Sequence, residues 1–325
     1  MQRSHHGTGS AVSMHTESVL NVRKEFMKCK IGRHKKRIIK VTIILLLFVL
    51  LFVVWAIWGN LTIATTYYNV TSEKIPSLFD GYKIVQISDL HNAEFGHDNA
   101  LIIEIIDKAE PDIIVITGDL IDSSRTNIDI AVRFASQAAR IAPCFYVTGN
   151  HEARIGSDYQ QLEKGITDAG VKILHDESVS LYKNGDTIQL IGLDDPQFAG
   201  RDESVQEGTL ESKLKGLKLQ DGFNLLLSHR PELFKVYVSA NMDLVLSGHT
   251  HGGQFRLPFI GGIVAPDQGL FPKCDAGIFR ENGTTMVISK GLGNSVIPFR
   301  LNNRPEIVIV ELNSKNDMFQ MKNAQ

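Results

Sequence analysis

Five short, largely apolar runs recur along the chain, and each ends in Ser or Thr directly before side chains that can bind a metal ion. The runs cover residues 82–88, 112–117, 144–148, 223–228 and 243–247. Short apolar runs of this kind are typical of strands that are buried on both faces. The sequence therefore predicts a buried sheet whose strands each lead into a polar group.

Helical patterns separate some of these runs. Residues 99–111 and 127–143 each end at a proline, and residues 158–170 end at a glycine, as helices do. Strands that alternate with helices predict an α/β fold, and sites in such folds lie at the carboxyl ends of the strands. We therefore expect all five polar groups at one edge of one sheet.

Other parts of the chain have strand patterns without helices. Residues 181–193 predict a hairpin with its turn at Asn184 and Gly185. Residues 284–293 and 304–312 predict two further strands near the C-terminal end. These segments extend the sheet structure beyond the five runs.

The polar groups after the five runs contain the candidate site residues. They are Asp89 and His91, then Gly118, Asp119 and Asp122, then Gly149, Asn150, His151 and Glu152, then His229, and finally Gly248, His249 and His251. Five of the eleven histidines of the chain therefore stand directly after predicted strands. We interpret the other six as ordinary solvated or structural residues, including His97, which lies near the first group.

These motifs, D-x-H, G-D-x-x-D, G-N-H-E, a lone His and G-H-x-H in that order, resemble those of the calcineurin-like metallophosphoesterases. The match spans residues 83 to about 251. The longer GHTHGGQ, the SHRPE around His229 and the closing PFR and RPEIVIVEL segments resemble a membrane-associated, YkuE/YaeI-like branch. The resemblance implies a four-layer α/β/β/α sandwich and a metal-dependent phosphoesterase, a hydrolase that acts on phosphoric ester bonds.

The resemblance also implies a role for each matching residue. One divalent ion would be bound by Asp89, His91 and His251, a second by Asn150, His229 and His249, and Asp119 would bridge the two. His151 would be the catalytic residue that faces the substrate phosphate. Asp122 and Glu152 would support the ligands from outside.

The chemistry of these side chains agrees with that implication. Mixed carboxylate, imidazole and amide ligands suit Mn, Fe, Zn or Ni better than Ca or Mg, and we favour Mn. Two cations bridged by a carboxylate lower the pKa of a bridging water, so that a hydroxide is available to attack phosphorus. His151, if protonated, would stabilise the transition state or protonate the leaving oxygen.

Several single residues have plainer interpretations. Asp122 could cap a helix, and Glu152 could be a surface carboxylate. We interpret residues 194–196, which read Asp-Asp-Pro, as an ordinary turn. Arg154 and Arg300 are left out of the core site, because most arginines are solvated.

A second feature of the chain is an uncharged apolar stretch at residues 41–59. It approaches the ~20 residues that cross a bilayer. Trp55 and Trp58 lie at its far end, where an interfacial belt would place them. The basic residues before it are Arg33, Lys35, Lys36, Arg37 and Lys40. They predict a single-pass signal anchor in the cell membrane, with a cytoplasmic N-terminus and an extracytoplasmic catalytic domain; a cleaved signal peptide is the alternative.

These patterns predict five segments along the chain. They are a basic cytoplasmic tail at 1–37, a transmembrane anchor at 38–59, a linker and leading strand at 60–82, a phosphoesterase domain at 83–312 and a polar tail at 313–325.

Composition narrows the class of partner. With 34 basic and 36 acidic residues the net charge is −2, which favours no nucleic-acid partner. The three cysteines, Cys29, Cys144 and Cys274, form no CxxC motif and are not assigned to catalysis. The expected partners are a phosphoester substrate, with lipid or cell-envelope esters favoured by the topology, and the lipid membrane. A non-catalytic metal-binding scaffold, and a protein phosphatase or nuclease of the same fold, are the alternatives.

Overall fold

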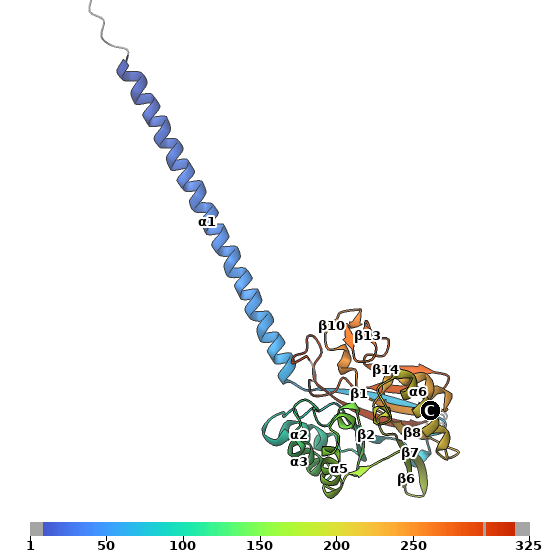
Figure 1. The fold of residues 1–325 in the computed structure, drawn as a ribbon. Helices are drawn as coiled ribbons and strands as arrows, with labels where there is room; N and C mark the ends of the chain where they lie inside the picture. The colour runs from blue at the N-terminus through green and yellow to red at the C-terminus, as the bar shows by residue number, and fades with distance from the viewer. Residues whose placement is uncertain (1–8, 295–296, 316–325) are drawn as a thin grey trace, which may run out of the picture. The chain divides into compact units, whose positions relative to one another are not determined.

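The computed structural model describes residues 9–294 and 297–315. The chain divides into two compact units, Met1–Ile57 and Trp58–Gln325. Helix α1 (Gly9–Leu61) makes up the described part of the first unit and runs into the start of the second (Figure 1). Its segment His34–Leu61 is long and apolar enough to cross a membrane, and the most apolar part of that segment is not buried inside the structure. The predicted anchor at 38–59 lies within this segment.

The second unit contains two six-stranded sheets. The first has the strand order β1 (Ala64–Ser72), β16 (Glu306–Ser314), β2 (Tyr82–Ile87), β3 (Ile113–Thr117), β4 (Cys144–Val147) and β5 (Lys172–Ile173). All neighbours are parallel except β16 and β2. The leading strand expected within 60–82 is β1, which pairs with β16 from Ala64↔Glu306 to Ser72↔Ser314. β16 thus runs just past the predicted domain end at 312, and residues 316–325 lie outside the described residues.

The second sheet has the order β14 (Gly277–Glu281), β15 (Thr284–Ile288), β9 (Leu244–Ser247), β8 (Asn224–Leu227), β7 (Asp186–Gly192) and β6 (Glu177–Lys183). Its four central strands are parallel, and an antiparallel strand closes each edge. β6 and β7 form the predicted hairpin, with both turn residues, Asn184 and Gly185, at positive φ. This conformation suits Asn-Gly.

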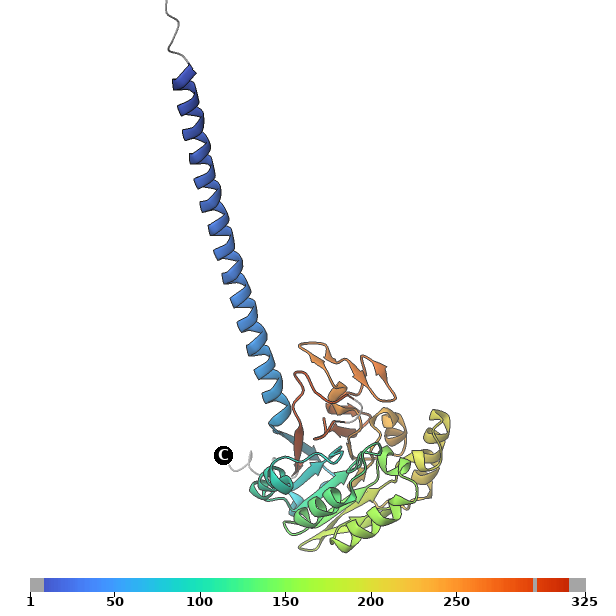
Figure 2. The ribbon, with the colours of Figure 1, turned by 60° about the vertical axis from the view of Figure 1, so that its left-hand side comes forward.

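The buried side chains form three layers of core around the two sheets. Ile84 of β2 packs in a cluster with Leu225 of β8 and Leu246 of β9, so the sheets face each other. Val85, the next residue of β2, points to the opposite face, as strand geometry requires. Helices α2 (Ala100–Ala109), α3 (Ile128–Ala138) and α5 (Asp158–Asp168) cover that face, and α6 (Glu203–Gly216) and α7 (Phe234–Ser239) cover the outer face of the second sheet (Figure 2). The α/β/β/α sandwich is confirmed.

One expectation drawn from the strand pattern is wrong. The five runs do not share one sheet, because β2, β3 and β4 belong to the first sheet and β8 and β9 to the second. Their carboxyl ends still meet at a common rim of the sandwich. Gln86 at the end of β2 donates to the carbonyl of Ser247 at the end of β9 (2.8 Å) and to the Thr117 hydroxyl at the end of β3 (3.0 Å).

The predicted helices are present, but they end earlier than the punctuation residues suggested. The segment 127–143 becomes α3, which ends at Ala138 because a tight turn follows, with Ile141 N–H bonded to the Ala138 carbonyl. Shorter helical turns are α4 (Asn150–Arg154) and 3-10 turns at Ser77–Phe79, His97–Asn99, Pro196–Phe198, Pro231–Leu233 and His251–Gly253.

Two small hairpins project from the sandwich beside the rim (Figure 2). The first pairs β10 (Arg256–Leu257) with β11 (Gly261–Gly262), and the second pairs β12 (Val264–Ala265) with β13 (Gly269–Leu270). Both follow directly from the loop that contains His249 and His251. No sequence pattern had indicated them.

Candidate metal centre

The backbone at the rim is held in an unusual conformation. Asp89, His91, Asp119, His249 and His251 all have φ between 48° and 71°, the left-handed region that side chains other than glycine rarely adopt. Such conformations persist only where the surrounding structure enforces them, and they concentrate at functional sites. Here they turn five predicted ligands inward at the ends of their strands.

The first group of side chains consists of Asp89, His91 and His251. The Nε2 atoms of the two imidazoles lie 3.1 Å apart, and Asp89 Oδ1 lies 3.6 Å from the Nε2 of His251 and 3.9 Å from that of His91. All three side chains are buried. Three potential ligand atoms from β2 and from the loop after β9 thus converge on one point.

The second group consists of His229, His249 and Asn150. His229 Nε2 lies 3.2 Å from His249 Nδ1. The amide oxygen of Asn150 lies 2.8 Å from that Nδ1 and 3.3 Å from that Nε2. Turned over, the same amide would donate to both rings and accept from Arg154, so the protein groups alone favour the turned orientation, and the inward oxygen would need a cation between the three groups.

Asp119 lies between the two groups. Its Oδ2 is 3.1 Å from His229 Nε2 and 3.6 Å from His91 Nε2. Its Oδ1 accepts the backbone N–H of His151 (2.8 Å). One carboxylate therefore reaches both clusters, and together the groups contain all seven predicted ligands; their role as ligands stays a prediction.

The hydrogen-bonding pattern fits cations at these positions. His229 Nδ1 lies 2.7 Å from the carbonyl of Thr117, which can only accept, so a neutral ring carries its proton on Nδ1 and has its lone pair on Nε2. That lone pair faces a carboxylate oxygen of Asp119 and the amide oxygen of Asn150. Three electron-rich atoms converge in a buried space, an arrangement that a positive charge stabilises.

The pKa shifts of the same residues also favour positive charge between these groups. Burial opposes protonation of His229, but the adjacent Asp119 carboxylate outweighs it and raises the pKa of His229 to about 10. Conversely, the imidazoles around Asp119 overcome its burial and hold the pKa of that carboxyl well below its usual range. In the first group, burial lowers the pKa of His91 and of His251. Neutral imidazole is the form that binds a metal.

Glu152 holds the loops that position Asp119. Its carboxylate accepts the backbone N–H groups of Asp119 (2.9 Å), Gly149 (2.7 Å) and Ile121 (3.3 Å). Burial and the Asp119 carboxylate raise the pKa of Glu152, while these N–H donors oppose the shift. The side chain is fully buried, so its interpretation as a surface carboxylate is wrong.

Asp122 stabilises a turn and does not cap a helix. It does not cap α3, because the N-cap of that helix is Asn127. Its Oδ1 accepts from Ser124 N–H (2.8 Å) and its Oδ2 from Arg125 (3.0 Å), so it stabilises the turn after β3.

His151 stands at the start of α4, beside the first group. Its Nδ1 accepts the backbone N–H of Ser123 (2.9 Å), so a neutral ring carries its proton on Nε2. Burial lowers the pKa of His151 to about 4. With this pKa the ring is neutral near pH 7 and offers an Nε2–H hydrogen bond, so the condition of a protonated ring, on which the role considered from the sequence depends, is not met in this state.

A set of charged side chains behind the second group was missed by the sequence analysis. Asp267 Oδ2 lies 2.9 Å from His249 Nε2, which places a proton on Nε2 and leaves the Nδ1 lone pair to face the cluster. Arg230 also donates to Asp267, and its Nε and Nη2 bind the two oxygens of Asp195 (2.6 and 3.1 Å). Asp195 is therefore not just a turn residue, although it also caps the 3-10 turn that follows it.

Arg300 and Arg154, which were left out of the core site, both lie beside it. Arg300 is fully buried, with its Nη2 3.3 Å from His251 Nδ1, and it donates to the carbonyls of Lys290 and Gly293. Burial lowers its pKa to about 10. Arg154 faces the amide of Asn150 and donates to Gln197 (3.1 Å). In the sequence, Arg230 lies in the SHRPE motif that contains His229, and Arg300 lies in the PFR motif.

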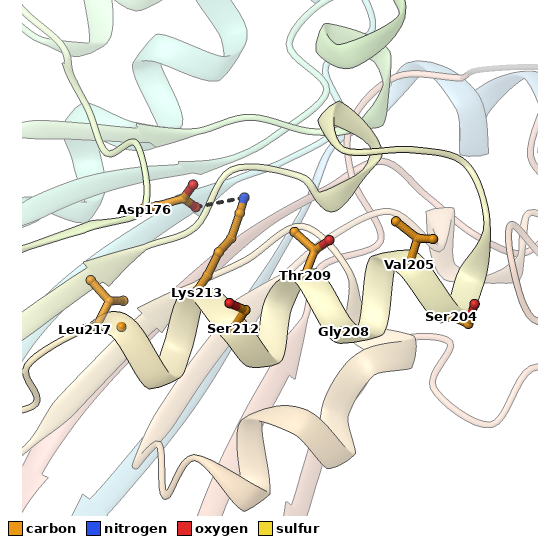
Figure 3. Close-up of a pocket in the computed structure, with 9 residues that line it drawn as sticks. Asp176, Ser204, Val205, Gly208, Thr209, Ser212, Lys213 and Leu217 are labelled. Carbon is orange, nitrogen blue, oxygen red and sulfur yellow. Dashed lines mark ion pairs between the residues drawn. The ribbon is translucent and has the colours of Figure 1, made fainter.

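A groove of about 620 Å³ lies along α6 and is lined by other residues than those of the two groups (Figure 3). Lys213 crosses it to pair with Asp176 at 2.9 Å. Its lining includes none of the seven predicted ligands and not His151. The chemistry of the molecule is therefore expected at the rim and not in this groove.

Comparison with known proteins identifies the family to which the chain belongs. The model for the calcineurin-like phosphoesterases matches residues 82–253, which include every predicted ligand. The chain is 32% identical over 265 residues to the metallophosphoesterase YkuE of Bacillus subtilis, covering 78% of this chain and 87% of that protein.

Two further relatives differ in length and in what their names state. Phosphodiesterase YaeI of Escherichia coli is 30% identical over 238 residues, covering 71% of this chain and 82% of YaeI. A protein of Bos taurus named as a transmembrane protein with a metallophosphoesterase domain is 32% identical over 256 residues. That match covers 75% of this chain but 56% of the bovine protein.

Proposed function

Since the chain belongs to the calcineurin-like phosphoesterase family and is therefore a hydrolase of phosphoester bonds, we propose that it is a membrane-anchored enzyme that works with two divalent cations. The observation that carries this proposal is the position of Asp119, whose one carboxylate oxygen lies within 3.6 Å of an imidazole nitrogen in each group. A single cation site would not need a carboxylate shared in this way.

The two groups at the rim would hold the cations. The proposed ligands are Asp89, His91 and His251 for the first and Asn150, His229 and His249 for the second, with Asp119 shared. Bound there, the cations would make water acidic enough to act as the nucleophile near neutral pH and would offset the charge of the phosphoryl group. Nitrogen and oxygen donors in this mixture support Mn, with Fe, Zn and Ni as alternatives.

The residues of the chain supply the remaining functions. His151 would donate its Nε2–H to a phosphoryl oxygen or to the leaving oxygen, and its bond from Ser123 N–H fixes the tautomer that does so. Glu152 connects the loop of Asp119 to the loop of Asn150, because its carboxylate accepts three backbone N–H bonds from the two loops. Asp267 and Arg230 orient the His249 ring from behind.

The membrane part of the proposal rests on α1 and on its basic flank. The apolar segment His34–Leu61 is long enough to span a bilayer. Lys35, Lys36 and Lys40 precede the most apolar stretch, so the N-terminus would stay in the cytoplasm and the phosphoesterase domain would lie outside. The bovine relative, described as a transmembrane protein, supports such an anchor.

The proposal is tested with the full-length chain in detergent, stripped of metal with EDTA. A chromogenic phosphodiester and the matching monoester are offered with Mn, Zn, Fe, Ni or Mg added back singly. We expect no turnover without metal, restoration by Mn and a dependence on two cations per chain. Full turnover after exhaustive metal removal would contradict the proposal, and two bound cations with no turnover of either ester would favour the scaffold alternative.

A further inference from the structure

The two small hairpins beside the rim expose an unusual concentration of apolar side chains. Leu257, Phe259 and Ile260 belong to the first hairpin, and Leu270 and Phe271 to the second. Phe259 is completely exposed, and Leu270 is 70% exposed. Clusters of exposed apolar side chains mark contact sites for proteins or membranes.

These tips are held out in place by the bonds at their base. Asp275 accepts from Arg256 Nη1 (2.8 Å) and from the backbone N–H of Gly262 (2.6 Å), which joins both strands of the first hairpin. The Phe271 N–H bonds to the Ile263 carbonyl (2.8 Å), which closes the base of the second hairpin, and the Ile263 N–H bonds to the Phe255 carbonyl (2.8 Å) next to the first. These bonds at the base fix the positions from which the apolar side chains are exposed.

The base of the hairpins is linked to the end of α1 through residues 300 and 301. Arg256 N–H donates to the carbonyl of Leu301 (3.0 Å). The neighbouring Arg300 exchanges two backbone-to-side-chain bonds with Asn60 (2.7 and 2.8 Å). Asn60 lies within the segment His34–Leu61, and both partners belong to the second unit.

The end of α1 carries a tryptophan of the kind that lies at the edge of a bilayer. Trp58 stacks under the Arg304 guanidinium at 4.8 Å, and a Trp at the end of a span marks the headgroup level. Phe259 stands three residues beyond Arg256, in the turn between β10 and β11, and its side chain is fully exposed there. Apolar groups at an interface enter ~5–10 Å into the boundary between headgroups and acyl chains.

The same hairpins lead directly into the proposed active site. Asp267, which bonds to His249, lies in the turn between β12 and β13. The Gly253 carbonyl, two residues after His251, accepts the N–H of Ile263 between the two hairpins. A phosphoester held at the rim would therefore have its apolar part beside the hairpins.

We propose that the hairpin segment 256–271 lies in the interface of the bilayer that α1 spans, and that the rim takes a lipid phosphoester from that bilayer. The bilayer is favoured over a protein partner because residues 300 and 301 link the base of the segment to the end of the spanning helix. The choice of substrate rests on the proposed function, whereas the contact with the bilayer does not.

The contact is tested on the full chain in vesicles of phosphatidylethanolamine and phosphatidylglycerol. Cys29→Ser and Cys274→Ser leave only the buried Cys144, and Phe259→Cys then takes an environment-sensitive fluorophore. The matched control is Tyr182→Cys, which replaces an exposed aromatic residue paired with the start of β7, at the rim opposite the site. Lipids that carry a nitroxide near the headgroup are the quencher.

We expect the nitroxide lipids to reduce the fluorescence of the probe at 259 at least about twofold and to leave the probe at 182 unchanged. Equal quenching at the two positions, or none at either, would overturn the contact. Turnover of a soluble chromogenic phosphodiester is measured on both labelled chains, so a failure of the proposed function appears separately as metal-dependent activity absent from both.

The substrate class is tested with two versions of one chromogenic phosphodiester, one with a methyl group and one with a long alkyl chain inserted in the vesicles. We expect kcat/KM to favour the alkyl ester by roughly tenfold, and Phe259→Ser with Ile260→Ser to remove this preference without changing turnover of the methyl ester. Tyr182→Ser should keep the preference. Equal kcat/KM for the two esters in the unmodified chain would overturn the lipid substrate even if the hairpins touch the bilayer.

Discussion

The two groups of proposed ligands differ in what lies behind their imidazole rings. In the second group, the outer nitrogen of His229 faces the Thr117 carbonyl and that of His249 faces the Asp267 carboxylate. In the first group, His91 Nδ1 is buried with no hydrogen-bond partner among the described residues, and His251 Nδ1 faces the Arg300 guanidinium. Among the residues that the structure describes, an acceptor stands behind each ring of the second group, where the Arg230 guanidinium also lies 3.4 Å from His249 Nε2, and no acceptor stands behind the rings of the first.

This difference matters because the outer partner of a ligating histidine sets how well the ring donates to a cation. An acceptor fixes the required tautomer and raises the basicity of the inner nitrogen. A guanidinium behind the ring favours the opposite tautomer, with the proton on the inner nitrogen. We therefore expect the second position to bind its cation more tightly than the first, so that the two positions fill in order.

The largest effect should come from removing the carboxylate that the two groups share. Asp119→Asn should lower kcat by about a thousandfold or more, because it weakens both positions at once. The matched control is Asp129→Asn, an exposed aspartate in the first turn of α3, which should leave kcat unchanged. Retention of more than a tenth of the activity in the Asp119 variant would mean that the two groups work independently.

Removing one ring from each group tests the predicted order of affinity. His91→Ala should keep about one Mn per chain through dialysis, and His229→Ala under the same conditions should lose most of its metal. Metal content per chain, measured by mass spectrometry, gives the result. The reverse pattern would show that the outer partners do not set the affinity.

The contribution of a single outer partner is smaller. Asp267→Asn should weaken the second cation by about 10–100-fold while leaving the first unchanged, because His249 loses the acceptor behind it. Asp221→Asn, an exposed aspartate away from the rim, is the control. Isothermal titration of the metal-free protein with Mn resolves the two binding steps, and weakening of both steps alike would point to a general loss of structure.

The smallest effect concerns a histidine with carboxylates on both sides. His175 contacts Asp194 through Nδ1 (2.8 Å) and Glu163 through Nε2 (3.0 Å), and the hydrogen bond with Asp194 raises its pKa above the usual 6.5. The protonated ring therefore stabilises the fold below pH 6.5, and this contribution is lost as pH rises through the raised pKa. Because the side chain is partly exposed, the change should stay below about 1 kcal/mol.

His175→Gln should remove that pH dependence and leave the metal content unchanged. Thermal unfolding of the two proteins at a series of pH values from 6 upward gives the comparison. Loss of metal in this variant would contradict the view that His175, between its two carboxylates, binds a proton and has no part in metal binding.

Sequence patterns located the proposed ligands at the strand ends because each motif is local. A residue such as His91 is placed by the strand directly before it, so its position at the rim follows from the chain itself. The division of the strands between two sheets could not be predicted from the residues alone, because buried parallel strands read alike in either sheet.

The outer shell was beyond the reach of local patterns for a different reason. Asp267 lies in an ordinary turn, 18 residues from the histidine that it orients, and only tertiary packing brings the two together. Asp195 was interpreted as a turn residue, and it is one, but its buried carboxylate also pairs with Arg230. Burial, which no local motif records, separates these residues from other aspartates in turns.

The strand order of the first sheet bears on how the domain is assembled during synthesis. β16 lies between β1 and β2, so the last strand of the described chain separates the first two. Until residues 306–314 have emerged, β1 has no partner and β2 has only β3 beside it. Pairing across such a long stretch of chain is slow and leaves strand edges open to aggregation. The domain can therefore complete its fold only after translation has passed residue 314, long after α1 has been made.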